Sequence, residues 1–291
     1  MKYKKCPTCD INYITAEGED VCDVCKQLMQ PVYTGKKGGK TKKIPKPKVE
    51  GNIAFKCNYC DGGKDSTQIG YAGVCSEANI RENILVKKRK WCSYPECKCQ
   101  QYINGKFTYA QLSAFDSFCY ESRVLIDWKA SAGEDLQEGA KEGKNRRLSK
   151  DVSGGLCVLT AITPDMKDER ERIVFGVFIT DKFEEGEDGV VSGFVQCTSK
   201  YKIKLSPAEA KQILFWNYYF NKNEQEIVGW AQGLFRYIEN YQAAQILRDI
   251  VDVKKGAADE QTAIEFLQEF CKRKHIDPSE IPENNGALTR E

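Results

Sequence analysis

The chain has 291 residues and a formal net charge of +2, with 41% hydrophobic and 30% charged residues. This length and composition predict about two soluble domains with an apolar core. No apolar run is long enough to cross a bilayer, and none follows the first lysines, so we expect neither a membrane partner nor a secretory signal. The expected location is the reducing cytoplasm, where paired cysteines favour metal binding over disulfides.

Residues 1–32 contain two CxxC pairs separated by twelve residues, formed by Cys6, Cys9, Cys22 and Cys25. This spacing places four thiolates near the corners of a tetrahedron, which predicts a zinc ribbon whose metal supplies the folding free energy. The segments CPTC, NYI and CDVC resemble the N-terminal zinc ribbons of many bacterial proteins. That resemblance implies a structural zinc in a module that binds a partner or a nucleic acid.

Residues 33–52 are rich in lysine and glycine and show no hydrophobic period, which predicts a basic flexible linker. Seven lysines and no acidic residue lie between Thr34 and Val49. If the protein binds nucleic acid, Lys42 and Lys43 are expected to contact phosphates independently of sequence.

Residues 53–133 hold seven of the fourteen cysteines, which predicts a helical subdomain organised by a metal. Two assignments are open, because zinc and iron–sulfur clusters both accept four thiolates without one fixed spacing. A second zinc, which is favoured as the commoner centre, would use the CxxC pair of Cys57 and Cys60 with two later cysteines. An iron–sulfur cluster would use the later cysteines instead, and some of the thiols could be simple core residues. The candidate ligands are Cys57, Cys60, Cys75, Cys92, Cys97, Cys99 and Cys119.

A helix is predicted from Ser76, as its N-cap, to Lys90, with Ile80, Ile84 and Leu85 on one face. A second helix is expected over residues 107–133, with a turn signal near Asp116 that would divide it. The basic end of the first helix is a candidate phosphate-binding surface, although solvated charges explain it as well. The candidate contacts at this helix end are Lys87, Lys88, Arg89, Lys90 and Trp91, and a separate basic group adds Arg146 and Arg147.

Beyond residue 150 the pattern changes to β-branched and aromatic runs, which predict strands at residues 156–163, 172–180, 190–199 and 201–205. Ser206 and Glu209 form a capping-box pattern that opens a helix over residues 206–220. Trp216 and Tyr218 on that helix either stack on a base or, as aromatic residues do more often, build the core. Two amphipathic helices are expected at residues 241–255 and 259–275.

The order VLTAITPDMKDERERIVFGVFI, then a strand pair, then SPAEA at a helix start resembles the PUA-like superfamily, which includes the EVE and YTH readers of modified bases. The resemblance covers roughly residues 150–240 of a domain expected at 150–275. It implies a pocket for a nucleic-acid base at the side of a barrel. Bacterial readers of this kind are often coupled to defence nucleases.

The chain has a single histidine, His275, which argues against HNH nuclease chemistry, a His-based triad and an HExxH protease. No phosphate-binding loop of the GxxxxGK[ST] type occurs. We therefore expect a non-catalytic, zinc-dependent protein that binds DNA or RNA, with a modified base as its target in a defence or regulatory setting. The alternatives are an iron–sulfur or metal-dependent nuclease or redox enzyme, and a protein–protein scaffold.

The expected fold is α+β. It consists of the ribbon, the cysteine-rich helical subdomain, and a small antiparallel sheet or partly closed barrel with flanking C-terminal helices.

Overall fold

The computed structural model describes residues 51–115, 119–131, 147–187, 192–230 and 233–290, together with the backbone of three short strands near the N-terminus. The chain divides into two compact units, Met1–Pro47 and Lys48–Glu291. In the first unit, β1 (Tyr3–Lys5) pairs antiparallel with β2 (Asn12–Ile14) and with β3 (Gln30–Val32). The predicted ribbon ligands, the linker lysines and Arg146 lie outside the described residues.

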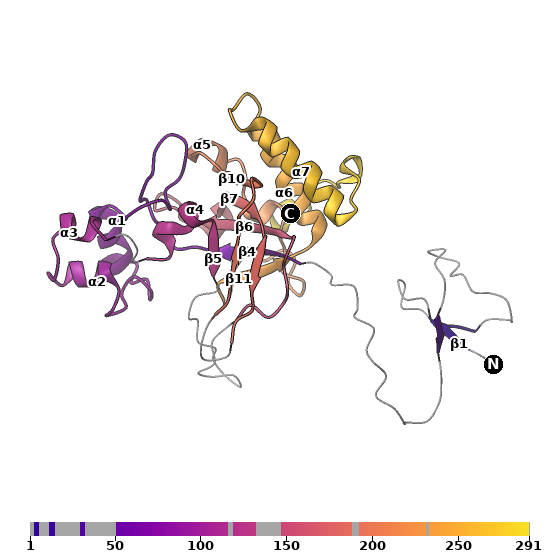
Figure 1. Ribbon diagram of the computed structural model, residues 1–291, viewed down its shortest axis with the longest axis horizontal. Helices are drawn as coiled ribbons and strands as arrows, with labels where there is room; N and C mark the ends of the chain where they lie inside the picture. Colours follow the sequence, from indigo (N-terminus) through magenta and orange to yellow (C-terminus); the bar gives the residue numbers. More distant parts are fainter. Residues whose placement is uncertain are drawn as a thin grey trace, which may run out of the picture. The chain divides into compact units, whose positions relative to one another are not determined.

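The second unit is built on a five-stranded sheet in the order β10–β7–β6–β4–β11 (Figure 1). All of its pairs are antiparallel except β4 with β6, so the sheet is mixed. Every residue of β6 and β7 is buried, which explains their continuous apolar runs. The strands are β4 (Asn52–Lys56), β6 (Leu156–Ala161), β7 (Ile173–Ile179), β10 (Lys202–Lys204) and β11 (Phe235–Ile238).

The α+β class is confirmed, but among the described strands no sheet closes into a barrel. The partly closed barrel, one of the two expected forms, is therefore wrong, because β10 and β11 remain edge strands on opposite sides of the sheet. A second sheet, β5–β9–β8, joins the cysteine-rich segment to the C-terminal half. Its strands are β5 (Lys129–Ser131), β8 (Lys182–Glu184) and β9 (Phe194–Gln196).

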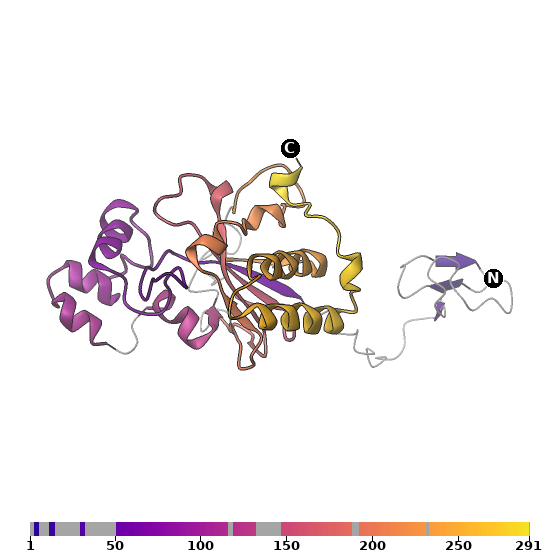
Figure 2. The same ribbon diagram turned by 90° about the horizontal axis from the view of Figure 1, so that it is seen from above.

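Two helices, α6 (Asn240–Val253) and α7 (Glu260–Lys274), lie side by side against the five-stranded sheet (Figures 1 and 2). Both were expected from their amphipathic pattern. Ile246 and Phe266 are buried, and the Phe266 ring lies 5.7 Å from that of Tyr201, beside β10. Two 3-10 turns follow, η6 (Pro278–Glu280) and η7 (Ala287–Thr289). No helix within the described residues is long and apolar enough to cross a membrane.

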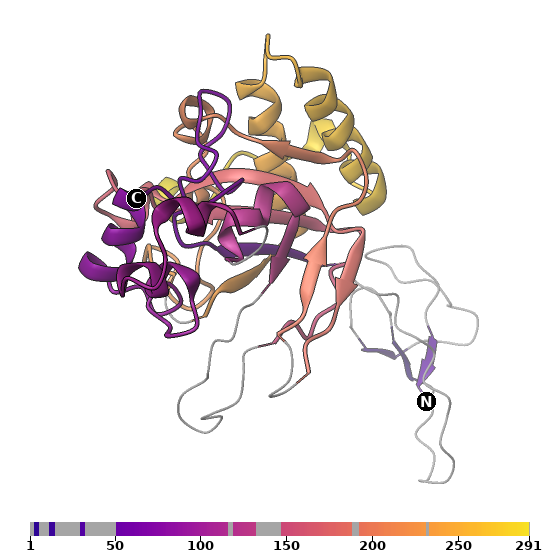
Figure 3. The same cartoon turned by 60° about the vertical axis from the view of Figure 1, so that its left-hand side comes forward.

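The cysteine-rich segment forms short helices that project from the sheet on the side away from α6 and α7 (Figures 1 and 3). They are α1 (Glu77–Arg81), the π-helix η1 (Glu82–Val86), α2 (Lys98–Ile103), α3 (Tyr109–Ser113), the 3-10 turn η2 (Glu121–Arg123) and α4 (Val124–Asp127). Because β4 precedes these helices and pairs with β6, the segment shares one sheet with the C-terminal half. The two predicted domains therefore belong to one unit.

The first predicted helix begins as expected, since Ser76 Oγ accepts a hydrogen bond from the backbone N–H of Asn79 at 3.2 Å. It ends at Val86 rather than Lys90, because the final turn is a π-helix. Ile80 and Ile84, four positions apart, share the buried face, whereas Leu85 lies off that face and is 52% exposed. The second predicted helix is interrupted and contributes α3, η2 and α4 separately.

The capping box of Ser206 and Glu209 is present, but α5 (Pro207–Ala210) lasts only one turn. The aromatic run that follows lies on η5 (Phe215–Asn217) instead of an amphipathic helix. A further 3-10 turn, η4 (Glu169–Glu171), precedes β7. Trp216 and Tyr218 are 0% and 1% exposed, and the Tyr218 hydroxyl donates to Asp249 at 2.8 Å. Both aromatic residues belong to the core, so this structure does not offer them to a base.

Candidate functional site

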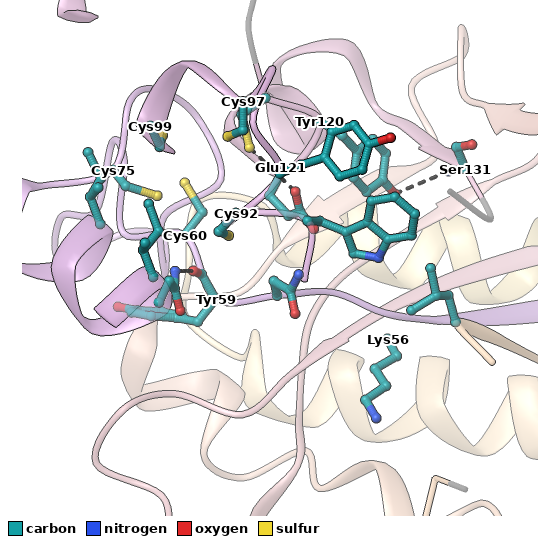
Figure 4. Close-up of a pocket in the computed structure, with 18 of the residues that line it drawn as sticks. Lys56, Tyr59, Cys60, Cys75, Cys92, Cys97, Cys99, Tyr120, Glu121 and Ser131 are labelled. Carbon is teal, nitrogen blue, oxygen red and sulfur yellow. Dashed lines mark hydrogen bonds between the residues drawn. The ribbon is translucent and has the colours of Figure 1, made fainter. Parts of the chain in front are cut away.

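A cavity of about 390 Å³ opens between the end of β4, the turns around α1 and α2, and η2. Six of the cysteines predicted as ligands line it: Cys60, Cys75, Cys92, Cys97, Cys99 and Cys119. Figure 4 shows cysteines gathered at one end, Tyr120, Ser131 and Lys56 at the other, and Glu121 between them. None of the cysteines in the described residues forms a disulfide.

A tight glycine loop brings Cys60 and Cys75 together across the cavity wall. The backbone N–H of Tyr71 donates to the Cys60 carbonyl at 3.2 Å, and that of Ala72 donates to the Gly62 carbonyl at 2.9 Å. Asp61 accepts hydrogen bonds from the N–H and the hydroxyl of Ser76 at 2.8 and 2.5 Å. The Cys60 thiol donates to the Gly73 carbonyl at 3.5 Å, so Cys60 lies against the turn that leads to Cys75.

Two buried asparagines fasten the helical turns to the end of β4. The side-chain amides of Asn79 and Asn83 both donate to the Tyr59 carbonyl, at 3.1 and 3.0 Å. One carbonyl next to Cys60 thus anchors both α1 and the π-helix. The chain then turns back through Cys97, the N-cap of α2, and Cys99 follows in the first turn of that helix.

Cys119 and Glu121 close the cavity from the η2 side. The Cys119 thiol donates to Glu121 Oε2 at 3.4 Å, and the Ser122 hydroxyl donates to the Cys119 carbonyl at 2.6 Å. Burial raises the pKa of the Glu121 carboxyl. Glu121 thus forms part of the cavity wall, a position that no local sequence pattern indicates.

Cys57 is separated from the other candidate ligands. It continues the direction of β4, with its N–H donating to the Thr160 carbonyl at 2.9 Å, and its side chain belongs to the buried core. It is not part of the cavity lining, whereas Cys60 is. Both cysteines belong to the buried core, but only Cys60 borders the cavity, so the zinc assignment that pairs them stays a prediction.

The thiols that share the cavity do not converge on one point. Within the described ranges, no three cysteine, histidine, aspartate or glutamate side chains are grouped as ligands of a single metal ion. They are instead distributed over the cavity wall on four chain segments, around residues 60, 75, 92–99 and 119. The geometry differs from that of a closed four-sulfur zinc site, in which every sulfur lies about 2.3 Å from one ion.

The other end of the cavity is aromatic. Trp91, Tyr94 and Tyr120 contribute to its lining, and the first two rings lie 6.5 Å apart with planes inclined by 38°. The hydroxyl of Tyr120 accepts a hydrogen bond from the backbone N–H of Ser131 at 3.1 Å, which fixes the ring against β5. Trp91 was predicted as a nucleic-acid contact, and the structure places it in the cavity directly before Cys92.

Positive charge is concentrated beside the aromatic end. Lys56 lines the cavity, and burial followed by the charge of Arg172 lowers its pKa. The charges of Arg89 and Arg236 also lower the pKa of Lys56, whereas the charge of Glu169 raises it.

The guanidinium groups of Arg172 and Arg236 lie 5.0 and 5.5 Å from the ring of Trp230, and Arg172 is only 2% exposed. Sequence reasoning missed Lys56, Arg172 and Arg236. They are scattered along the chain and only tertiary contacts bring them together.

The remaining predicted nucleic-acid contacts have different surroundings. Lys88 and Lys90 are exposed, and the ammonium of Lys90 lies 5.3 Å from the Trp91 ring. Lys87 is paired with Glu82 at 3.6 Å. Arg147 donates to the Gly186 carbonyl at 2.8 Å, which gives it a role in holding a loop.

The chain was compared with models of known protein families, with curated proteins and with solved structures, and none of these comparisons found a match. The resemblance to PUA-like base readers therefore remains a prediction. Function has to be inferred from the cavity and the charges around it.

Proposed function

We propose that the chain is a non-catalytic nucleic-acid-binding protein, with a base held at the aromatic end of the cavity and phosphates held by the adjacent basic residues. The observation that carries the proposal is the position of Lys56. It lines an aromatic pocket, and its burial and the charges of Arg172, Arg89 and Arg236 lower its pKa, although Glu169, the ion-pair partner of Arg172, acts in the opposite direction. An anionic ligand that also carries a flat ring would relieve this repulsion and stack on the pocket wall.

The surface next to the pocket fits the same ligand. Lys88 and Lys90 are exposed and directly precede Trp91 in the chain, so phosphate contacts and the base pocket would be adjacent. Contacts from arginine and lysine to the phosphate backbone of the nucleic acid supply affinity. A base that leaves its stack in the nucleic acid gains contacts with the aromatic side chains of the pocket. DNA and RNA, and a plain or modified base, are alternatives within this proposal.

Binding of labelled single-stranded and duplex DNA and RNA of one length tests the proposal, by fluorescence anisotropy between about 50 and 200 mM salt. The affinity is expected to fall steeply as salt rises. Replacing both lysines, in K88A/K90A, should weaken binding and reduce the slope of log K against log salt by about two. Trp91→Ala should weaken binding with little change in that slope, because it removes a stacking surface and no charge.

Lys272→Ala is the matched control, since Lys272 is an exposed lysine at the end of α7. It should bind as the unmodified protein does. Absent binding to all four nucleic acids, or binding whose affinity does not change with salt, would contradict the proposal.

A further inference from the structure

The sulfur end of the cavity has a composition that a protein interior rarely shows. The cavity of about 390 Å³ is open to solvent, but Cys60, Cys75 and Cys99 at this end are at most 8% exposed. Six thiols line it together with Ile80 and Ile84. Such a concentration of thiols along one cavity wall is more than isolated buried cysteines would produce, and their reactivity, including metal binding, usually explains why cysteines are kept.

The arrangement of the thiols distinguishes between the two kinds of centre that take four cysteines. One zinc ion needs four sulfurs that converge on one point, and the described residues contain no such group. A cluster of several irons takes its thiolates from different directions around a larger volume. The six cavity thiols come from four chain segments around the space, as a cluster requires.

The donor set is also chemically suited to iron and sulfide. The only histidine of the sequence, His275, caps the C-terminal end of α7, so the cavity offers six thiols and the carboxylates of Glu96 and Glu121 but no imidazole. Ile80 and Ile84, which are 2% and 6% exposed, form an apolar wall beside the thiols, and such surroundings tune iron–sulfur clusters in proteins.

We propose that the cavity thiols hold a polynuclear iron–sulfur cluster rather than a second zinc. Cys60 and Cys75 stand at the two ends of the glycine loop, and Cys97 and Cys99 stand at the start of α2, so each pair borders the cavity at one place. One thiolate from each pair, with Cys92 and Cys119, makes the four ligands. The cluster would fasten the segments before α1, before α2 and before η2 to the end of β4, next to the aromatic pocket.

The full-length protein, purified without oxygen and then supplied with ferrous iron, sulfide and a thiol reductant, provides the test. The expected product is brown and contains about two or four irons per chain with an equal amount of acid-labile sulfide. Cys92→Ser and Cys119→Ser should each lose most of the iron and the visible absorption. Cys57→Ala should retain both, because Cys57 lies outside the cavity, and so should Cys197→Ser as a matched buried control.

A measurement on the unmodified protein keeps the test valid if a variant fails to fold. Alkylation followed by mass spectrometry should find the cavity cysteines protected in the iron-loaded protein and reactive after chelation of the iron, with Cys157 unchanged. Equal alkylation of the cavity cysteines in both states would overturn the proposal. So would a colourless protein with two zinc ions and no iron, or iron that is lost in Cys6→Ser but retained in Cys92→Ser.

Discussion

At the scale of single residues, the most informative position is Lys56, because its charge is unfavourable in the protein alone. Burial and the neighbouring Arg172 both lower its pKa, so the folded chain disfavours the protonated side chain. Residues of this kind often serve a ligand at some expense of stability.

Lys56→Met should therefore separate binding from stability. We expect nucleic-acid affinity to fall by roughly tenfold, as for loss of one charged contact, while the thermal midpoint stays equal or rises. Anisotropy and thermal unfolding followed by circular dichroism measure the two effects. A variant that binds normally, or that loses binding because it unfolds, would argue against a ligand role for Lys56.

A second residue-scale feature is the buried ammonium of Lys254 at the end of α6. Its Nζ lies 2.9 Å from Glu209 and 3.0 Å from Asp259, and its side chain is only 5% exposed. It joins the capping box of α5 to the start of α7. Lys254→Met should lower the free energy of unfolding by about 3 kcal/mol, because it leaves a partly buried carboxylate without its partner.

Urea unfolding measures this loss. The exposed pair of Lys255 and Asp252 is the control, since its side chains are 68% and 59% exposed. Lys255→Met should change the free energy of unfolding by less than about 0.5 kcal/mol. Equal effects of the two substitutions would contradict the importance of burial.

The same ion pair predicts a pH dependence. Burial would raise the pKa of Glu209, but hydrogen bonds from Ser206 and Lys254 outweigh it and hold the pKa below its usual 4.5. A lowered pKa in the folded state stabilises the protein above the unfolded pKa, and the contribution is lost as the pH falls through the folded value. The free energy of unfolding, measured from pH 7 downward, should therefore decline below about pH 4.5. In the Glu209→Gln variant the same free energy should decline less steeply.

At the scale of elements, the glycine loop between β4 and α1 determines whether Cys60 and Cys75 meet. Gly70 has a φ of +146°, and a Cβ at this position would lie 2.1 Å from the Cys60 carbonyl oxygen. Any side chain there must push the two halves of the loop apart. The spacing of the cysteines along the sequence contains no sign of this close approach.

Gly70→Ala should cost about 3 kcal/mol of stability, from backbone strain and the collision together, and should reduce the iron content. Gly105→Ala is the control, because Gly105 also has a positive φ, of 77°, but nothing lies within 4 Å of its Cβ position. That variant should cost only about 1 kcal/mol. Unfolding in urea and iron analysis check both, and a normal iron content in Gly70→Ala would show that the loop is not needed for the cluster.

At the scale of the whole molecule, the two compact units predict independent folding. The described strands of the first 47 residues pair with one another, and the core of the second unit is one cluster of buried residues that begins at Ile53. A protein consisting of residues 48–291 should therefore unfold at the same temperature as the full chain. Because it lacks ten of the lysines, including Lys42 and Lys43, it should also show a shallower salt dependence of nucleic-acid binding.

Circular dichroism and anisotropy compare the shortened and the full chain. Cys6→Ser in the full chain is the control, because it removes one predicted zinc ligand and keeps all the lysines. A lower midpoint for the shortened chain would show that the first unit stabilises the second.

The sequence by itself determined the features that depend on nearby residues. These are the α+β class, the strands β6 and β7, the helices α6 and α7, and the caps at Ser76 and Ser206. Each rests on hydrophobic period or on a side chain that bonds the backbone a few positions away. The clustering of cysteines likewise indicated the segment that contains the cavity.

Only the tertiary structure decided which residues share the site. The parallel pairing of β4 with β6 is accompanied by a hydrogen bond from the Leu156 N–H to Asn52 Oδ1, across 104 positions of sequence. That pairing directs Cys57 into the core, leaves Cys60 at the cavity, and places Lys56 near Arg172. The physical reason is that burial, and the side of a strand that faces the core, depend on contacts between distant segments that no local pattern encodes.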